Sequence, residues 1–256
     1  MGGLKVAAVQ MGFYREPTEK AIDEAERQVR LASARGAELV CLPEHWLFYT
    51  VIEEDDGIIR RFASLAKDEG VHINLGGSFE RRGAKVYMTS QTVSPEGTVS
   101  RQDKIHLYRR EKERAVPGSG FRLVDVRGFK VGVLVCHDIV FPEAAREVTL
   151  KGAELLLVPS FITAKGIEPW LVYLRARALE NRVPVVAPNI YAPPRLPGKS
   201  AVIDLSYDRK AHVMELAERM APGRRTLVLA DIDVSSKGPL RSERLRELRL
   251  TTSHSE

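Results

Sequence analysis

Cys136 is the side chain with the clearest potential for chemistry in this sequence. It ends the apolar run 131–136, which is typical of a strand, and Pro142, a common first-turn helix residue, follows six positions later. A cysteine at such a junction lies at the rim of a sheet, where the helix dipole favours the thiolate. The alternative is a buried structural thiol, because free cysteines are among the most buried residues. That alternative is favoured for Cys41, which lies inside the apolar run 39–42.

A nucleophilic cysteine needs a base, and Glu44 is the best candidate in the sequence. Neighbouring residues on a strand point to opposite faces, so His137 is badly placed to take a proton from Cys136. Glu44 follows a second predicted strand and would reach the same rim if the two strands lie close together. Lys104 follows another strand, and a buried ammonium there would hold a developing oxyanion. The plainer alternatives are a solvated loop carboxylate for Glu44 and an ordinary surface charge for Lys104.

The order of the predicted elements indicates one α/β domain over residues 1–236. The chain opens as β-α-β-α, continues with antiparallel strands joined by hairpins, and then alternates strands and helices again. A four-layer α-β-β-α sandwich accommodates this order. The charged tail, 237–256, is expected to be helical. The predicted strands are 4–11, 38–42, 71–79, 85–93, 98–103, 121–126, 130–136, 155–159, 184–187, 201–205, 211–216 and 226–234, and the predicted helices are 17–35, 56–69, 141–151 and 170–181.

Composition excludes several classes of protein. With 256 residues, 44% hydrophobic and 29% charged, the chain can bury a core without disulfides or structural metals. Its longest apolar runs, 131–136 and 155–159, fall far short of the roughly 20 residues that span a bilayer, so no transmembrane helix is expected. No secretory signal pattern is visible at the N-terminus. Two cysteines and no Asn-X-Ser/Thr sequon fit a reducing cytoplasm.

Charge and ligand motifs argue against nucleic acid, nucleotide and metal binding. The net charge of +5 is spread along the chain and interleaved with carboxylates, as in 109–114, whereas a nucleic-acid reader usually concentrates it. Gly198-Lys199-Ser200 lacks the earlier glycine of a phosphate-binding loop, and Gly118-Ser119-Gly120 lacks the third glycine of a dinucleotide fingerprint. The six histidines show no paired metal-ligand spacing. No cofactor or metal is therefore expected.

Several short motifs, in a fixed order, resemble the nitrilase or carbon-nitrogen hydrolase superfamily. Glutamate and lysine are 60 residues apart, and lysine and cysteine 32. Any one motif is weak, but all of them in order form a strong signal. The motifs are Leu42-Pro43-Glu44, Lys104-Ile105-His106-Leu107, Val135-Cys136-His137-Asp138, Phe141-Pro142-Glu143, Glu111 six residues before Pro117-Gly118, Lys151-Gly152-Ala153-Glu154, Arg177 to Arg182, and Gly198-Lys199-Ser200.

The resemblance implies a catalytic triad of Glu44, Lys104 and Cys136, with Glu111 as an accessory glutamate. Glu44 would take the thiol proton and later deliver it to the leaving amine, while Lys104 and the backbone N–H of His137 would bind the oxyanion. Cys136 would form a thioester, release ammonia and then be freed by water that Glu44 activates. Glu111 would orient Lys104 and touch the substrate amine. The family needs no metal.

The residue after the nucleophile bears on the substrate. Family members that hydrolyse nitriles commonly carry Cys-Trp-Glu, so Cys136-His137-Asp138 favours an amide or N-carbamoyl substrate. Trp46, Tyr49 and Phe161 are candidates for the wall of the acyl pocket, with core packing as the alternative for each. A nitrilase proper is the main rival interpretation.

Three other functions are possible for this chain, and the resemblance also predicts how copies of it assemble. The chain could transfer the acyl group or supply ammonia to a partner, act as a non-catalytic interaction module, or, least favoured, bind nucleic acid. The resemblance also implies a homodimer or higher homo-oligomer paired across a helical face. The tail 237–256 could clasp the second copy, and a plain solvated helix is the alternative.

Overall fold

Two β-sheets form the centre of the computed structural model, which describes residues 3–15, 18–54 and 56–248. The first sheet contains β1 (Leu4–Gln10), β2 (Leu39–Cys41), β3 (Val51–Glu53), β4 (His72–Asn74), β5 (Ser78–Arg82), β6 (Lys85–Val93), β7 (Val99–Asp103) and β16 (Thr226–Ile232). The second contains β8 (Leu123–Val126), β9 (Phe129–Val133), β10 (Leu155–Leu157), β11 (Val185–Ala187), β14 (Ala201–Asp208) and β15 (Val213–Met220). A separate short ribbon joins β12 (Tyr191–Ala192) and β13 (Leu196–Pro197).

The strand order of each sheet places the carboxyl ends of its parallel strands at one edge. The first sheet runs β16-β1-β2-β4-β6-β5-β3, with β7 on β6, and the second runs β15-β14-β11-β10-β9-β8. β2 lies parallel to both β1 and β4, and β10 lies parallel to both β9 and β11. Parallel strands bring their carboxyl ends to one edge, which is where segments that carry function collect.

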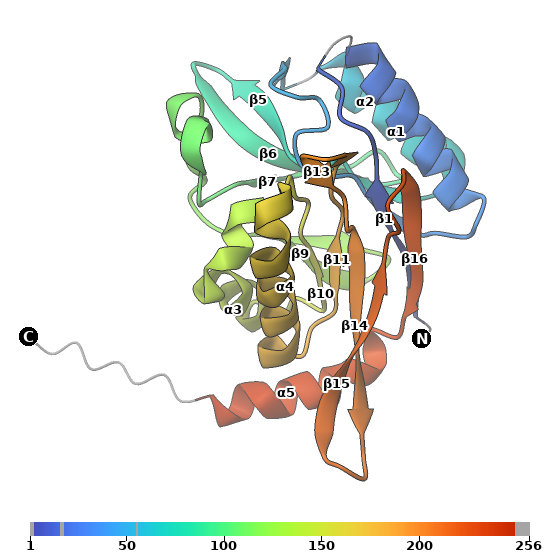
Figure 1. Ribbon diagram of the computed structural model, residues 1–256, viewed down its shortest axis with the longest axis vertical. Helices are drawn as coiled ribbons and strands as arrows, with labels where there is room; N and C mark the ends of the chain where they lie inside the picture. Colours follow the sequence, from blue (N-terminus) through green and yellow to red (C-terminus); the bar gives the residue numbers. More distant parts are fainter. Residues whose placement is uncertain (1–2, 16–17, 55, 249–256) are drawn as a thin grey trace, which may run out of the picture.

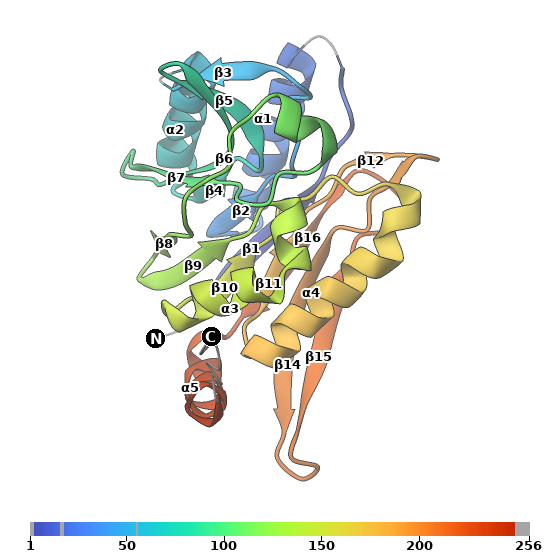
Figure 2. The same cartoon turned by 90° about the vertical axis from the view of Figure 1, so that its left-hand side faces the viewer.

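Helices cover both outer faces of the paired sheets (Figures 1 and 2). The helices are α1 (Thr18–Ser33), α2 (Gly57–Glu69), α3 (Pro142–Leu150), α4 (Ile167–Asn181) and α5 (Gly238–Glu247), and the short 3-10 helices are η1 (Arg109–Glu113), η2 (Cys136–Val140), η3 (Ala164–Gly166) and η4 (Ser235–Lys237). α1 and α2 pack on the first sheet, and α3 and α4 pack on the second. The predicted four-layer sandwich is confirmed.

Side-chain alternation along β1 shows how the layers are built. Ala7 and Val9 join a cluster with α1 and α2, whereas Val6 and Ala8 face the second sheet and join the cluster between the sheets. A third cluster lies between the second sheet and α3 and α4. Because successive residues of a strand point to opposite faces, short apolar strands without polar alternation are what two covered faces require.

The strand predicted over 71–79 is broken in the middle. β4 ends at Asn74 and β5 begins at Ser78, and Gly76 between them has a φ of +67°. A Cβ at Gly76 would lie 2.0 Å from the carbonyl oxygen of Pro43, so only glycine fits this crossing. The break lets the chain pass the segment that carries Glu44, and Glu44 forms an isolated bridge with Gly77.

Other element boundaries also differ from the sequence predictions. The strand predicted over 130–136 ends at Val133, so Cys136 lies on a turn and not on a strand. β3 was not predicted, because three residues are too few for a pattern. Residues 237–247 are helical as expected, while the rest of the charged tail, 249–256, lies outside the described residues. No helix in the described ranges is long and apolar enough to cross a membrane.

Candidate active site

Lys104 is the buried centre of the predicted triad. It follows β7 directly, its residue is 1% exposed, and its backbone N–H donates to the carbonyl oxygen of Met88. Its Nζ lies 2.7 Å from Oε1 of Glu44 and 2.9 Å from the carboxylate of Glu111. The structure therefore brings together three groups that are 60 and 7 residues apart in the chain. Two carboxylate partners offset the cost of burying the ammonium charge and fix its position.

Cys136 completes this group from the second sheet. It opens η2 with a φ of +48°, and its backbone N–H donates to the carbonyl oxygen of Pro159 at 2.9 Å. Its thiol lies beside the carboxylate of Glu44, which raises the thiol pKa, and beside the backbone N–H of Phe161, which lowers it. A non-glycine residue in the left-handed region is strained, and such strain clusters at functional sites.

The charges set the protonation state of each group. Burial raises the pKa of the Cys136 thiol, and the neighbouring Glu44 carboxylate raises it further, against the opposing effect of Lys104. Burial alone would lower the pKa of Lys104, but the negative charges of the Glu44 and Glu111 carboxylates raise it above its usual value. The resting pair is thus a neutral thiol beside a carboxylate, with an ammonium next to both.

Glu111 is turned inward and saturated with donors. Burial opposes its ionisation, but the hydrogen bonds from His45, Lys104 and the backbone N–H of Tyr108 lower its pKa to about 2. His45 Nε2 lies 3.3 Å and the Tyr108 nitrogen 2.7 Å from its two oxygens. Because these donors and Lys104 already converge on it, the geometry fits the orienting role predicted for Glu111 better than contact with a substrate amine.

A second carboxylate, Asp138, ties the lysine loop to the cysteine turn. It is fully buried, and one oxygen accepts from the backbone N–H and from Nδ1 of His106, at 2.8 and 2.9 Å. The other oxygen accepts from the backbone N–H of Val135 at 3.1 Å. Sequence reasoning gave Asp138 and His106 no role, although both belong to the motifs that carry Cys136 and Lys104.

Aromatic rings border the triad. Phe161 packs at 5.5 Å against His45 and at 5.4 Å against Phe13, and Tyr49 packs at 5.2 Å against His45. Tyr49 and Phe161 therefore both lie against His45, and their role as the wall of an acyl pocket stays a prediction. Phe13 was missed, since a single phenylalanine after a strand carries no pattern.

Trp46 does not join these rings. Its indole N–H donates to the carbonyl oxygen of Leu75 at 2.6 Å, and its ring packs at 5.5 Å against Phe62 in the cluster beneath α2. Trp46 follows the left-handed residue His45, and that turn directs it into the core. The prediction that Trp46 lines the pocket is replaced by its alternative, core packing.

His137 is only half-buried, and its ring leans away from the triad. The ring packs at 4.7 Å against Tyr108 and at 5.4 Å against Phe141. Burial, together with the positive charge of Lys104, lowers the pKa of His137, so the ring is neutral at pH 7. Its backbone N–H lies in the first turn of η2, where a helix leaves N–H groups without a partner inside the helix.

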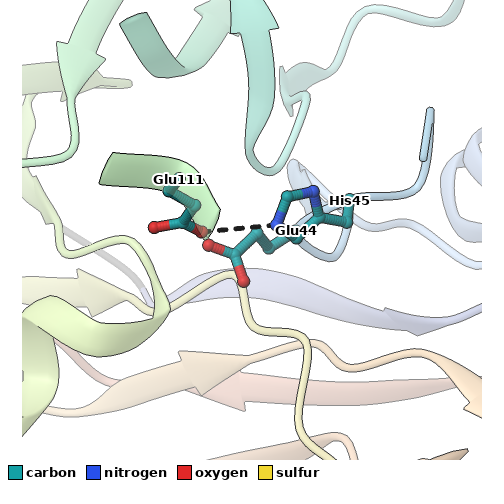
Figure 3. Close-up of side chains that lie close together, drawn as sticks. All are labelled: Glu44, His45 and Glu111. Atoms are coloured by element: carbon teal, nitrogen blue, oxygen red, sulfur yellow. Dashed lines mark hydrogen bonds and ion pairs between the residues drawn. The ribbon is translucent and has the colours of Figure 1, made fainter. Parts of the chain in front are cut away.

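Glu44, His45 and Glu111 also have the composition of a metal-ligand set. Figure 3 shows the three side chains converging. One ligand atom from each lies within 4.8 Å of the others. The Lys104 ammonium, however, already contacts both carboxylates at 2.7 and 2.9 Å. A metal ion there would be held against a like charge at close range, so the donor set fits an ammonium better than a metal.

Comparison with known proteins identifies the family of this chain. The family model for carbon-nitrogen hydrolases matches residues 5–241. The chain belongs to the carbon-nitrogen hydrolase family. A protein named nitrilase from Pyrococcus abyssi is 36% identical over 70% of this chain and 72% of its own length.

Two further comparisons extend over nearly the whole chain. An omega-amidase from Xenopus tropicalis is 29% identical over 95% of this chain and 93% of its own length. A solved structure of a CN-hydrolase superfamily protein from Xanthomonas campestris has the same fold, with a TM-score of 0.83, 23% identity and coverage of 98% and 99% of the two chains. The family resemblance inferred from the motifs is confirmed, and of these relatives one is named a nitrilase and another an omega-amidase.

Proposed function

We propose that the protein hydrolyses a small amide or N-carbamoyl compound, releasing ammonia through a thioester on Cys136. The observation that carries this proposal is the position of Glu44, whose carboxylate accepts from the ammonium of Lys104 at 2.7 Å and lies near enough to the thiol of Cys136 to raise its pKa. One base can then serve the nucleophile while the cation beside it faces the charge that develops on the substrate.

In the acylation step, Glu44 accepts the thiol proton as the sulfur of Cys136 attacks the carbonyl carbon. The carbonyl oxygen becomes an oxyanion, and Lys104 Nζ and the backbone N–H of His137 stabilise it. The tetrahedral intermediate then collapses, the carbon-nitrogen bond breaks, and Glu44 returns the proton to the leaving nitrogen. Ammonia leaves and a thioester remains.

Water completes the cycle in the deacylation step. Glu44, again a carboxylate, takes a proton from water as the oxygen attacks the thioester carbon, and Lys104 again stabilises the oxyanion. The carbon-sulfur bond breaks, and the proton returns to Cys136. Because burial keeps the Cys136 pKa high, the sulfur leaves as a thiol and not as a free thiolate.

Nitrile hydrolysis is the second candidate, favoured by the 36% identity to the Pyrococcus protein named nitrilase. The same thiol can add to a nitrile carbon. Against it stands His137 beside the nucleophile, where nitrile hydrolysers of the family commonly carry tryptophan.

Ammonia release by the purified protein tests the proposal. The panel is short aliphatic amides, ω-amides of dicarboxylates, N-carbamoyl amino acids and nitriles, with Cys136→Ala as the matched control. Release from amides or carbamoyl compounds, lost in Cys136→Ala, with an acyl adduct on Cys136 seen by mass spectrometry, would support the proposal. Release from nitriles alone would favour the second candidate, and silence across the panel would reject both.

We further propose that the protein works in the cytoplasm as a homodimer. Two free cysteines, Cys41 and Cys136, fit a reducing compartment. The exposed apolar side chains Leu150 and Val172, on α3 and α4, favour pairing through that helical face.

A further inference from the structure

We propose that His45 is a positioning residue, which donates Nε2–H to Glu111 and through it fixes the Lys104 ammonium. The inference rests on the hydrolytic function proposed above. His45 is only 8% exposed, and its Nε2 lies 3.3 Å from Oε1 of Glu111. Figure 3 shows the imidazole directed at this carboxylate.

The direction of this hydrogen bond follows from the state of Glu111. Its pKa of about 2 makes Glu111 a carboxylate at neutral pH, which can only accept. The hydrogen must therefore lie on Nε2 of His45. Without that donor the Glu111 carboxylate would still accept from Lys104 and from the backbone N–H of Tyr108. It would lose the hydrogen bond that fixes its position on the side facing His45.

The ring is fixed on its other sides as well. The ring packs at 5.8 Å against Phe79, and Nδ1 lies 3.2 Å from the carbonyl oxygen of Phe48, which accepts a hydrogen bond only when Nδ1 also carries a hydrogen. It also packs edge-on, at 5.5 Å, against Phe161, whose backbone N–H lowers the pKa of the Cys136 thiol. His45 thus contacts Glu111, which binds the Lys104 ammonium, and Phe161, which lies beside the nucleophile.

Two substitutions separate this role from general packing. In His45→Gln the side-chain amide reaches the position of Nε2 and keeps the donor to Glu111, whereas in His45→Asn the shorter amide reaches only the position of Nδ1. His45 has a φ of +57°, a region in which asparagine is favoured over most other residues. Backbone strain therefore favours the Asn variant, and the proposed hydrogen bond favours the Gln variant.

Steady-state kinetics on an amide that the parent protein hydrolyses provide the first readout. We expect His45→Asn to lower kcat by about tenfold to a hundredfold, the size of one hydrogen bond to a charged group, with KM nearly unchanged. His45→Gln should recover most of that loss. In a Glu111→Gln background, His45→Asn should add little, because residues that act as one unit are not additive. Equal losses in both variants, or multiplying losses with Glu111→Gln, would overturn the inference.

Proton NMR of 15N-histidine-labelled protein gives a readout that does not need activity. We expect one slowly exchanging Nε2–H signal that disappears in His45→Gln and moves in Glu111→Gln, where the acceptor loses its charge. If the parent cleaves nothing but the signal behaves in this way, the proposed function fails and the hydrogen bond stands. If the parent is active and Nε2 carries no such proton, the positioning role is wrong.

Discussion

At the scale of single residues, the site depends on Glu44 serving two partners at once. It is 1% exposed, it accepts from Lys104 at 2.7 Å, and it faces the Cys136 thiol. Its negative charge helps to keep the thiol protonated, and that same carboxylate is the proposed acceptor of the thiol proton. Loss of Glu44 should therefore separate two properties that usually change together, namely catalysis and thiol reactivity.

Glu44→Gln tests this separation. Amide hydrolysis should fall by about a hundredfold or more, the usual contribution of a general base. Alkylation of Cys136 by iodoacetamide at pH 7 should persist or accelerate, because removing the carboxylate lowers the thiol pKa towards the thiolate. The measurement is the alkylation rate, followed by mass spectrometry beside the ammonia assay. Cys136→Ala is the control, since the remaining Cys41 is fully buried. Parallel loss of both rates would contradict a general-base role.

Residue types and order were enough to predict Glu44, Lys104, Cys136 and Glu111, because their chemistry and motifs are readable along the chain. A role for His45 was not predicted, although it follows Glu44 directly. Its place in the sequence, on an expected loop, does not show where its imidazole ring points. That direction comes from a left-handed backbone at His45, with a φ of +57°. The same turn sends the neighbouring Trp46 into the core, where the sequence favoured neither alternative.

At the scale of elements, the break between β4 and β5 positions Glu44. The backbone N–H of His45 donates to the carbonyl oxygen of Gly77 at 2.8 Å, and a Cβ at Gly77 would lie 3.0 Å from Cγ of Glu44 and 3.1 Å from Cγ1 of Val135. The two sheets therefore approach each other here with no room for a methyl group. The hydrophobic pattern could not show this break, because the apolar residues Val71, Ile73, Leu75 and Phe79 keep one alternating pattern across it.

Gly77→Ala should consequently damage the site more than the fold. The methyl group would displace Glu44 or the segment that leads to Cys136, and kcat should fall by about tenfold or more, since misplacements near 1 Å can cost a hundredfold. Thermal unfolding should shift by only a few degrees, as expected for about 1 kcal/mol in a chain of this length. Gly120→Ala is the matched control, because its Cβ would meet no atom within 4 Å. An unchanged kcat in Gly77→Ala would show that Glu44 tolerates movement.

At the scale of the whole molecule, the four layers leave the helical face of the second sheet open to a partner. Leu150 on α3 is 51% exposed and Val172 on α4 is 57% exposed, and both helices lie on the same side of the sheet (Figure 2). The layer order was predictable because strand and helix periodicities alternate along the chain. The partner was not predictable from those periodicities, because a single exposed valine on a helix is ordinary.

Val172→Asp tests whether copies pair through this face. Sedimentation of the parent should give twice the chain mass of 28.6 kDa, and the variant should sediment as single chains. The reason is that a carboxylate buried against a second copy loses its hydration without gaining a partner. The control is Val51→Asp, on β3 of the other sheet, where the valine is 37% exposed. A dimer that survives Val172→Asp but dissociates in Val51→Asp would move the interface to the first sheet, and a monomeric parent would reject the pairing.

If the proposed pairing is correct, dissociation should also lower kcat. The reason is that α4 follows η3 and Phe161 in the chain, and Phe161 lies beside the sulfur of Cys136.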